Sequence, residues 1–155
     1  ARMRARLMNG YAVVSQPPKG LRYEKHPVHK KILVRDEPIA SILQDALEGF
    51  ASQRFETQTE VKRFLEAQPL YPKDLPCGTI RNQRVKDLLT NPLYGGLVEQ
   101  PDWGVSLRKG AHDGLVSVET YERIQERLNE TARAPARKDI SSDFPLRGFV
   151  LCGDC

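Results

Sequence analysis

Residues 79–89 read Thr79-Ile80-Arg81-Asn82-Gln83-Arg84-Val85-Lys86-Asp87-Leu88-Leu89. This stretch predicts a helix that is capped by Thr79 and runs to about Thr90. The helix should stop at Asn91-Pro92, because the residue before a proline avoids helical geometry. Three apolar residues recur at helical spacing and predict its buried stripe: Val85, Leu88 and Leu89.

The opposite face of this predicted helix is polar and basic. Arginine, asparagine and glutamine make bidentate contacts with guanine and adenine edges, and a recognition helix presents its N-terminal residues to the major groove. An ordinary solvated helix face carries similar side chains, so this helix alone leaves both interpretations open. The candidate DNA-contacting residues are Arg81, Asn82, Gln83, Arg84 and Lys86.

The neighbouring elements favour the DNA-binding interpretation. A strongly amphipathic helix follows Asp36-Glu37-Pro38, with Asp36 as its cap. A second helix starts at the capping box Thr57-Gln58-Thr59-Glu60 and ends before Pro69. After the third helix, residues 94–98 and 103–107 read as a hairpin. This order predicts an α+β fold, mainly helical and winged helix-turn-helix-like, with small β-hairpins.

Shorter elements are expected around these helices. The first eight residues read as the tail of a helix stopped at Asn9-Gly10. Three strands are predicted at residues 11–14, 21–23 and 32–34. Ser117 should cap a last helix. Its expected core-facing residues are Val118, Tyr121, Ile124 and Leu128.

Positive charge is concentrated in the N-terminal segment. Residues 1–35 hold nine Lys and Arg and one acidic residue, a net charge of +8 within a chain of net charge +4. Such a segment suits a polyanion, although an ordinary solvated surface explains the charge equally well. A second basic stretch lies in the non-periodic residues 132–143. The candidate phosphate contacts are Arg2, Arg4, Arg6, Lys30, Lys31, Arg133, Arg137 and Lys138.

The chain ends with Cys152-Gly153-Asp154-Cys155, which has the spacing of one zinc knuckle. Zinc prefers four ligands, so Cys152 and Cys155 are expected to be half of a zinc site in a longer protein, with no cofactor in this segment. Two surface cysteines are the alternative. The sparse cysteines indicate a reducing, cytoplasmic setting. No apolar run approaches the ~20 residues that cross a bilayer, so no membrane partner is expected.

No residue pattern predicts a catalytic site in this chain. His26-Pro27-Val28-His29 reads as an exposed loop, because no carboxylate or cysteine lies at a diagnostic spacing. Cys77 has no paired histidine motif, and His112-Asp113-Gly114 reads as a turn. The chain also lacks a glycine-rich phosphate loop.

Several motifs together resemble the recombinase domain of the large serine recombinases, in the resolvase/invertase superfamily. They occur in the family's order along nearly the whole chain: Asn9-Gly10-Tyr11, Pro17-Pro18-Lys19-Gly20-Leu21-Arg22-Tyr23, Val34-Arg35-Asp36-Glu37-Pro38, Leu88-Leu89-Thr90-Asn91-Pro92-Leu93-Tyr94-Gly95-Gly96, Val116-Ser117-Val118-Glu119-Thr120-Tyr121 and Phe144-Pro145-Leu146-Arg147-Gly148.

This resemblance implies how the chain is divided into domains and which function each domain has. Residues 1–10 would be the end of a long linker helix, 11–131 the recombinase domain, 132–145 a linker, and 146–155 the start of a zinc ribbon. The catalytic domain would lie outside this chain, so no serine here takes the nucleophile role. The parent protein would be a site-specific serine recombinase that acts on double-stranded DNA as a dimer or tetramer.

The sequence therefore predicts a DNA-binding module that recognises a recombination half-site and is not itself an enzyme. The alternative is a winged-helix interaction or scaffold domain that binds protein. A stand-alone metalloenzyme is the weakest interpretation, because only two ligands have convincing spacing.

Overall fold

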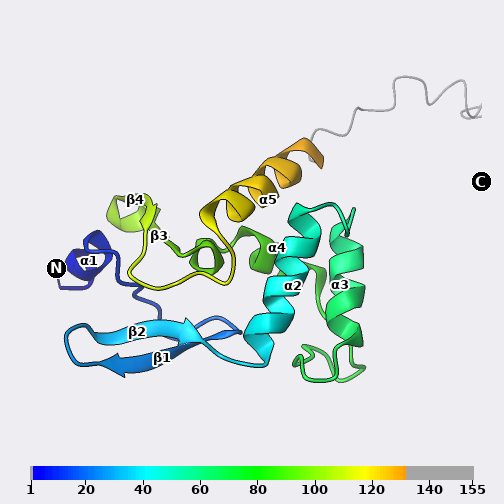
Figure 1. The fold of residues 1–155 in the computed structure, drawn as a ribbon, viewed down its shortest axis with the longest axis horizontal. Helices are drawn as coiled ribbons and strands as arrows, with labels where there is room; N and C mark the ends of the chain where they lie inside the picture. Colours follow the sequence, from blue (N-terminus) through cyan, green and yellow to red (C-terminus); the bar gives the residue numbers. More distant parts are fainter. Residues whose placement is uncertain (1, 132–155) are drawn as a thin grey trace, which may run out of the picture.

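Helices and two short β-hairpins make up the computed structural model, which describes residues 2–131 (Figure 1). The helices are α1 (Arg2–Met8), α2 (Ile39–Ala51), α3 (Gln58–Ala67), α4 (Asn82–Thr90) and α5 (Val118–Thr131), with short 3-10 turns η1 (Pro92–Gly95) and η2 (Pro101–Trp103). The strands are β1 (Leu21–His26), β2 (Lys30–Arg35), β3 (Leu97–Gln100) and β4 (Val105–Lys109). The predicted α+β class is confirmed, whereas the winged-helix arrangement and the domain boundaries stay predictions.

The strands pair only with their neighbours in the described part of the chain. β1 and β2 are antiparallel, from Leu21 opposite Arg35 to His26 opposite Lys30. β3 and β4 are also antiparallel, with an irregularity between Val98 and Gln100. The strands predicted at 21–23 and 32–34 are thus confirmed and extended.

Three strand predictions differ from the structure. The strand expected at 103–107 begins only at Val105, because Trp103 lies in the turn η2 and Gly104 is left-handed (φ 65°). Residues 11–14 form no strand, because their backbone pairs with a side chain: the Tyr23 hydroxyl donates to the Val14 carbonyl at 2.9 Å and accepts from the Val14 amide at 3.2 Å. The strand expected at 94–98 begins only at Leu97, after the turn η1 and the left-handed Gly96 (φ 73°).

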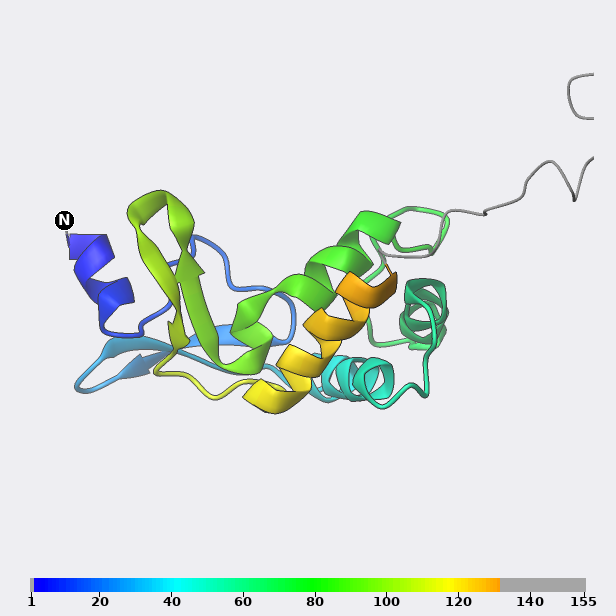
Figure 2. The same cartoon turned by 90° about the horizontal axis from the view of Figure 1, so that it is seen from above.

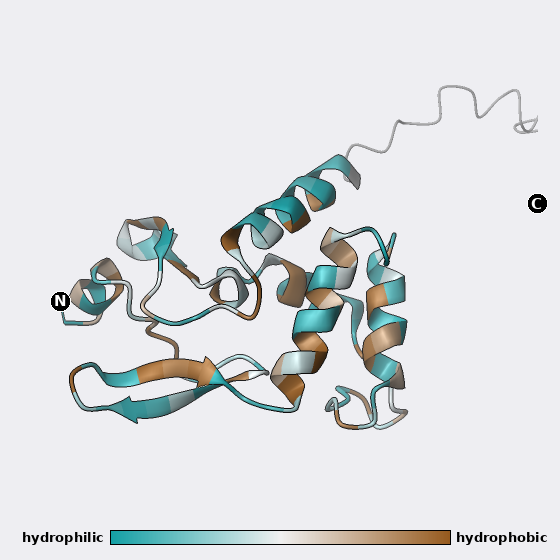
Figure 3. Cartoon of the chain, in the orientation of Figure 1, coloured by the Kyte–Doolittle hydropathy of each residue, from teal (hydrophilic) through white to brown (hydrophobic). Residues whose placement is uncertain are grey.

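Helix α2 provides the centre of the core. Its predicted apolar face is buried, with Leu43 and Ala46 fully inaccessible. Brown bands on α2 and β2 mark these hydrophobic segments in Figure 3. The predicted Asp36 side-chain cap was wrong, because the Glu37 carboxylate takes that place and accepts from the Ser41 amide at 3.0 Å and the Ser41 hydroxyl at 2.7 Å. Burial of this face against α3 and α5 stabilises the packing of these two helices on α2.

Helices α3 and α5 pack on α2, α4 packs on α3 and α5, and α1 lies against the β3–β4 hairpin. Thr57 caps α3 as predicted, accepting from the Glu60 amide at 3.3 Å. Ser117 caps α5 through the Thr120 amide at 3.2 Å. Val118 was wrongly placed in the core and is 36% exposed, since it begins α5 beyond the neighbouring helices. Figure 2 shows α1, the β3–β4 hairpin and α4 following one another across the molecule. No helix within residues 2–131 is long and apolar enough to cross a membrane.

Candidate nucleic-acid interface

Helix α4 begins three residues later than Thr79, the predicted cap. Its first residue is Asn82, and the residue before it is extended (φ −67°, ψ 139°) without a side-chain cap. The Thr79 hydroxyl lies 3.0 Å from the Cys77 thiol instead. Ile80 is buried, and its amide donates to Glu66 Oε1 of α3 at 2.8 Å. The chain is therefore fixed to α3 before α4 starts.

The two faces of α4 lie as the sequence predicted. The apolar stripe is buried: Val85, Leu88 and Leu89. The residues that we call the α4 polar face are all exposed: Arg81, Asn82, Gln83, Arg84 and Lys86. Their exposure makes contact with a groove of DNA sterically possible, while the contact itself stays a prediction.

The side chains of the α4 polar face differ in how firmly they are held. Gln83 donates to Asp87 Oδ1 one turn later at 2.7 Å. Arg84 Nε lies 3.3 Å from Asp74 Oδ1, in the loop before the helix. The Asn82 and Lys86 side chains make no hydrogen bond or ion pair with another residue in 2–131. Their polar groups are free to meet a ligand.

Asp74 joins α4 to the N-terminal segment. Its side chain is only 8% exposed, its Oδ1 accepts a hydrogen bond from the Lys19 ammonium at 3.4 Å, and the same oxygen forms an ion pair with Arg84 Nε at 3.3 Å. Burial alone would raise the pKa of Asp74, but the Lys19 and Arg84 charges hold that pKa below its usual range. The Lys19 ammonium also donates to the Pro72 carbonyl at 3.3 Å. Sequence reasoning missed this cluster, because Lys19 and Asp74 are 55 residues apart.

A second group of predicted contacts lies away from α4, around α1 and the turn of the β1–β2 hairpin (Figure 1). Arg2, Arg4, Lys30 and Lys31 are exposed. Arg6 is half-buried: it donates to the Lys31 carbonyl at 3.4 Å, so it ties α1 to β2. The structure thus places the predicted DNA contacts within residues 2–131 in two separate groups, one on α4 and one around α1 and the β1–β2 turn.

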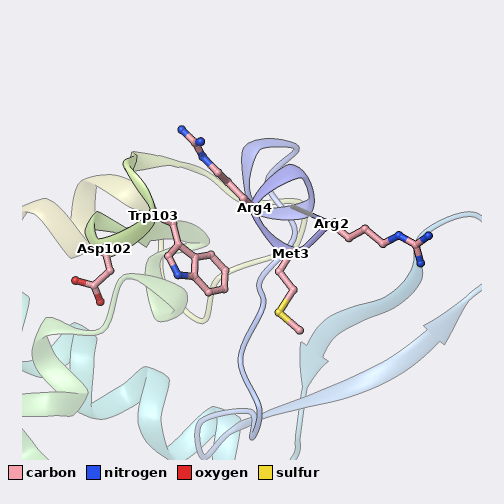
Figure 4. Close-up of a pocket in the computed structure, with 5 residues that line it drawn as sticks. All are labelled: Arg2, Met3, Arg4, Asp102 and Trp103. Atoms are coloured by element: carbon pink, nitrogen blue, oxygen red, sulfur yellow. The ribbon is translucent and has the colours of Figure 1, made fainter.

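A hollow of about 940 Å³ lies between α1 and the β3–β4 hairpin. Figure 4 shows Trp103 and Met3 lining it, with Arg2 and Arg4 pointing outward from α1. Met3 is 60% exposed and Trp103 38% exposed, although large apolar side chains are usually covered. The sequence reading placed Trp103 in a strand and assigned it no function.

The structure adds detail to the residues set aside as non-catalytic. The imidazoles of His26 and His29 stack with their centroids 4.6 Å apart. His112 is buried and its Nε2 lies 2.8 Å from the Leu93 carbonyl. Residues 2–131 contain no group of three or more His, Cys, Asp or Glu that could hold a metal ion. The predicted contacts Arg133, Arg137 and Lys138 and the predicted ligands Cys152 and Cys155 lie outside the described residues.

The family model for the recombinase domain matches residues 39–131, which include α2 through α5. The chain belongs to the recombinase family. The predicted resemblance to the recombinase domain of the large serine recombinases is therefore confirmed.

Solved structures share the fold of this recombinase domain. One, described as "Crystal Structure of a LSR-DNA Complex", superposes with a TM-score of 0.64 at 22% identity, covering 91% of this chain and 43% of that one. Another, described as "Sequence Requirements of the Listeria innocua prophage attP site", gives a TM-score of 0.61 at 23% identity, covering 87% of this chain and 54% of that one.

A phage protein is related over a shorter stretch. "Uncharacterized immunity region protein 5" of Bacillus phage phi105 is 32% identical over 69 residues, which is 44% of this chain and 48% of that protein. The chain spans about half the length of these similar proteins.

Proposed function

We propose that this recombinase domain recognises one half-site of duplex recombination DNA, with the α4 polar face in the major groove. The observation that carries the proposal is a helix whose apolar side is fully packed and whose other side exposes Arg81, Asn82 and Lys86. These side-chain types match the hydrogen-bonding patterns of guanine and adenine edges. The fold shared with a chain from an LSR–DNA complex supports the same function.

The basic groups on α1 and the β1–β2 turn would contact phosphates of the same duplex. Arg2, Arg4, Lys30 and Lys31 are exposed, and a phosphate contact needs charge and reach but no fixed geometry. Such contacts fix the register of a protein on DNA, whereas base contacts select the sequence. Both groups together would give an extended interface.

Strand cleavage and rejoining would belong to a separate catalytic domain of a site-specific serine recombinase. The parent protein would act as a dimer or tetramer on DNA, with zinc bound in a ribbon that includes Cys152 and Cys155. In this proposal, the chain recognises DNA and takes no part in strand cleavage or rejoining.

Selection from a pool of randomised DNA duplexes tests the proposal. The 155-residue chain is expected to enrich a recurring motif, and its affinity should fall with salt at a slope of about −0.9 in log–log form per neutralised phosphate. Failure to enrich any motif, with no retention of duplex at low salt, would overturn the proposal and favour a protein-binding domain.

A further inference from the structure

Arg84 differs from the other members of the α4 polar face because a buried group from outside the helix holds it. Its Nε lies 3.3 Å from Asp74 Oδ1, and the Asp74 side chain is 8% exposed, while the Arg84 side chain is 52% exposed. One end of the guanidinium is therefore fixed by the protein, and about half of the side chain remains accessible to a ligand.

The ion pair with Asp74 leaves the terminal N–H donors of Arg84 available to a ligand. A guanidinium carries five N–H donors in a planar fork, and an ion pair made on its Nε side leaves both terminal nitrogens to donate. Two parallel N–H donors match the O6 and N7 acceptors of guanine. A phosphate or a guanine edge can accept both donors, but only the contact with guanine distinguishes one base pair from another.

Asp74 is itself held firmly enough to orient its partner. Lys19 Nζ lies 3.4 Å from the same Oδ1, and the Lys19 ammonium is anchored on the Pro72 carbonyl at 3.3 Å. The adjoining backbone is fixed by the Leu75 amide, which donates to the Thr79 carbonyl at 3.2 Å. Flexible arginines lose rotamer freedom on binding, and an arginine already restrained loses less of it.

We propose that Asp74 is a positioning residue that holds Arg84 ready for a guanine edge in the major groove, so that one base preference depends on a side chain that does not touch DNA. The inference rests on the proposed function, since it concerns the same α4 polar face. It assigns Arg84 to base reading rather than to the phosphate backbone.

Lys19 offers a matched comparison within the same cluster. It shares the Asp74 oxygen, yet its ammonium is a point charge without the planar fork that a guanine edge requires. Lys19→Gln removes one partner of Asp74 but keeps the Asp74–Arg84 ion pair, so it is expected to lose only part of the base discrimination that Asp74→Asn loses.

The test uses the duplex enriched by the wild-type chain and a second duplex in which one guanine of the motif is replaced. The wild type should bind the enriched duplex roughly 5- to 100-fold more tightly than the duplex in which the guanine read by Arg84 is replaced. Arg84→Ala should bind these two duplexes with similar affinity, and this loss identifies the guanine that Arg84 reads. Asp74→Asn should lose most of the same discrimination, at the same base pair, with an unchanged salt slope. Asp74→Glu should restore part of it.

The outcomes separate positioning from a structural role. Asp74→Asn with wild-type discrimination, or with a uniform loss of affinity for both duplexes, overturns the inference while DNA binding stands. If Asp74→Asn does not fold in a thermal melt, Arg84→Lys decides, because lysine keeps the charge but has no fork to hold. Full discrimination by Arg84→Lys overturns the inference. A wild-type chain that enriches no motif refutes the proposed function instead.

Discussion

Gly49→Ala is expected to destabilise the protein, although alanine normally stabilises a helix. Gly49 lies inside α2, where replacement by alanine would contribute about 1 kcal/mol from helix propensity alone. In this structure an added Cβ would lie 2.5 Å from Cε2 and 2.7 Å from Cδ2 of Phe55. The overlap must be relieved by moving the ring or the helix.

The Phe55 ring has little freedom to move away. It packs on Phe64 with centroids 5.2 Å apart, Arg54 lies 4.8 Å above it, and the Phe55 amide donates to the Gly49 carbonyl at 3.0 Å. Overpacking of this kind costs about 1–3 kcal/mol, which exceeds the propensity gain. We expect a net loss of up to about 2 kcal/mol in the free energy of unfolding, equivalent to a fall in Tm of up to about 8 °C for a chain of this size.

Thermal melts of four proteins test this reasoning: the wild type, Gly49→Ala, Phe55→Ala and the double variant. In the Phe55→Ala background the ring overlap is gone and only the flexible end of Arg54, 2.7 Å from the added Cβ, must move, so Gly49→Ala should become stabilising by up to about 1 kcal/mol. A single Gly49→Ala variant more stable than the wild type would refute the reasoning and show that α2 and the Phe55 loop pack differently.

Two further predictions concern buried polar groups. Burial lowers the pKa of His112, so its contribution to stability is complete above about pH 6.5 and is lost as pH falls toward the lowered pKa of the folded state. In urea titrations from about pH 7 to about pH 5, the free energy of unfolding should therefore fall more steeply for the wild type than for His112→Gln. An equal fall for the two proteins would contradict this pKa shift. Arg127 donates to the carbonyls of Phe50, Phe55 (3.2 Å) and Glu56 (3.3 Å). Arg127→Met should lower the free energy of unfolding by about 2 kcal/mol in urea titrations. The control Arg123→Met replaces an exposed arginine of α5 and should change it by less than about 0.5 kcal/mol. Similar effects of the two substitutions would show that Arg127 does not anchor α5.

Local patterns were sufficient to predict the helices. The apolar period of α2 and the Thr57 cap depend on residues within a few positions of one another, and both were confirmed, although the Glu60 carboxylate accepts from the Glu56 amide and not from the Thr57 amide. The exposed side of α4 followed from the same periodicity, since burial of Val85 determines which residues face outward. These parts needed no knowledge of the rest of the chain.

Contacts between distant segments determined what the sequence could not predict. α4 starts at Asn82 because the Ile80 amide pairs with Glu66, 14 residues earlier, and not because of a local cap. The strand expected at 11–14 is absent because the Tyr23 hydroxyl takes the backbone groups of Val14. The Asp74 cluster likewise joins segments that no local pattern connects.

The most direct test of the central claim compares duplex binding by α4 variants with binding by a matched surface variant. Asn82→Ala combined with Lys86→Ala removes two exposed side chains of the α4 polar face that have no partner within residues 2–131, whereas Arg63→Ala removes an exposed positive charge from α3. Affinity for the enriched duplex is measured by fluorescence anisotropy across a salt series, with folding checked by thermal melts. The account predicts a loss of at least about tenfold for the α4 variant and little change for Arg63→Ala. Equal affinities for the α4 variant and the wild type, with both proteins folded, would contradict it.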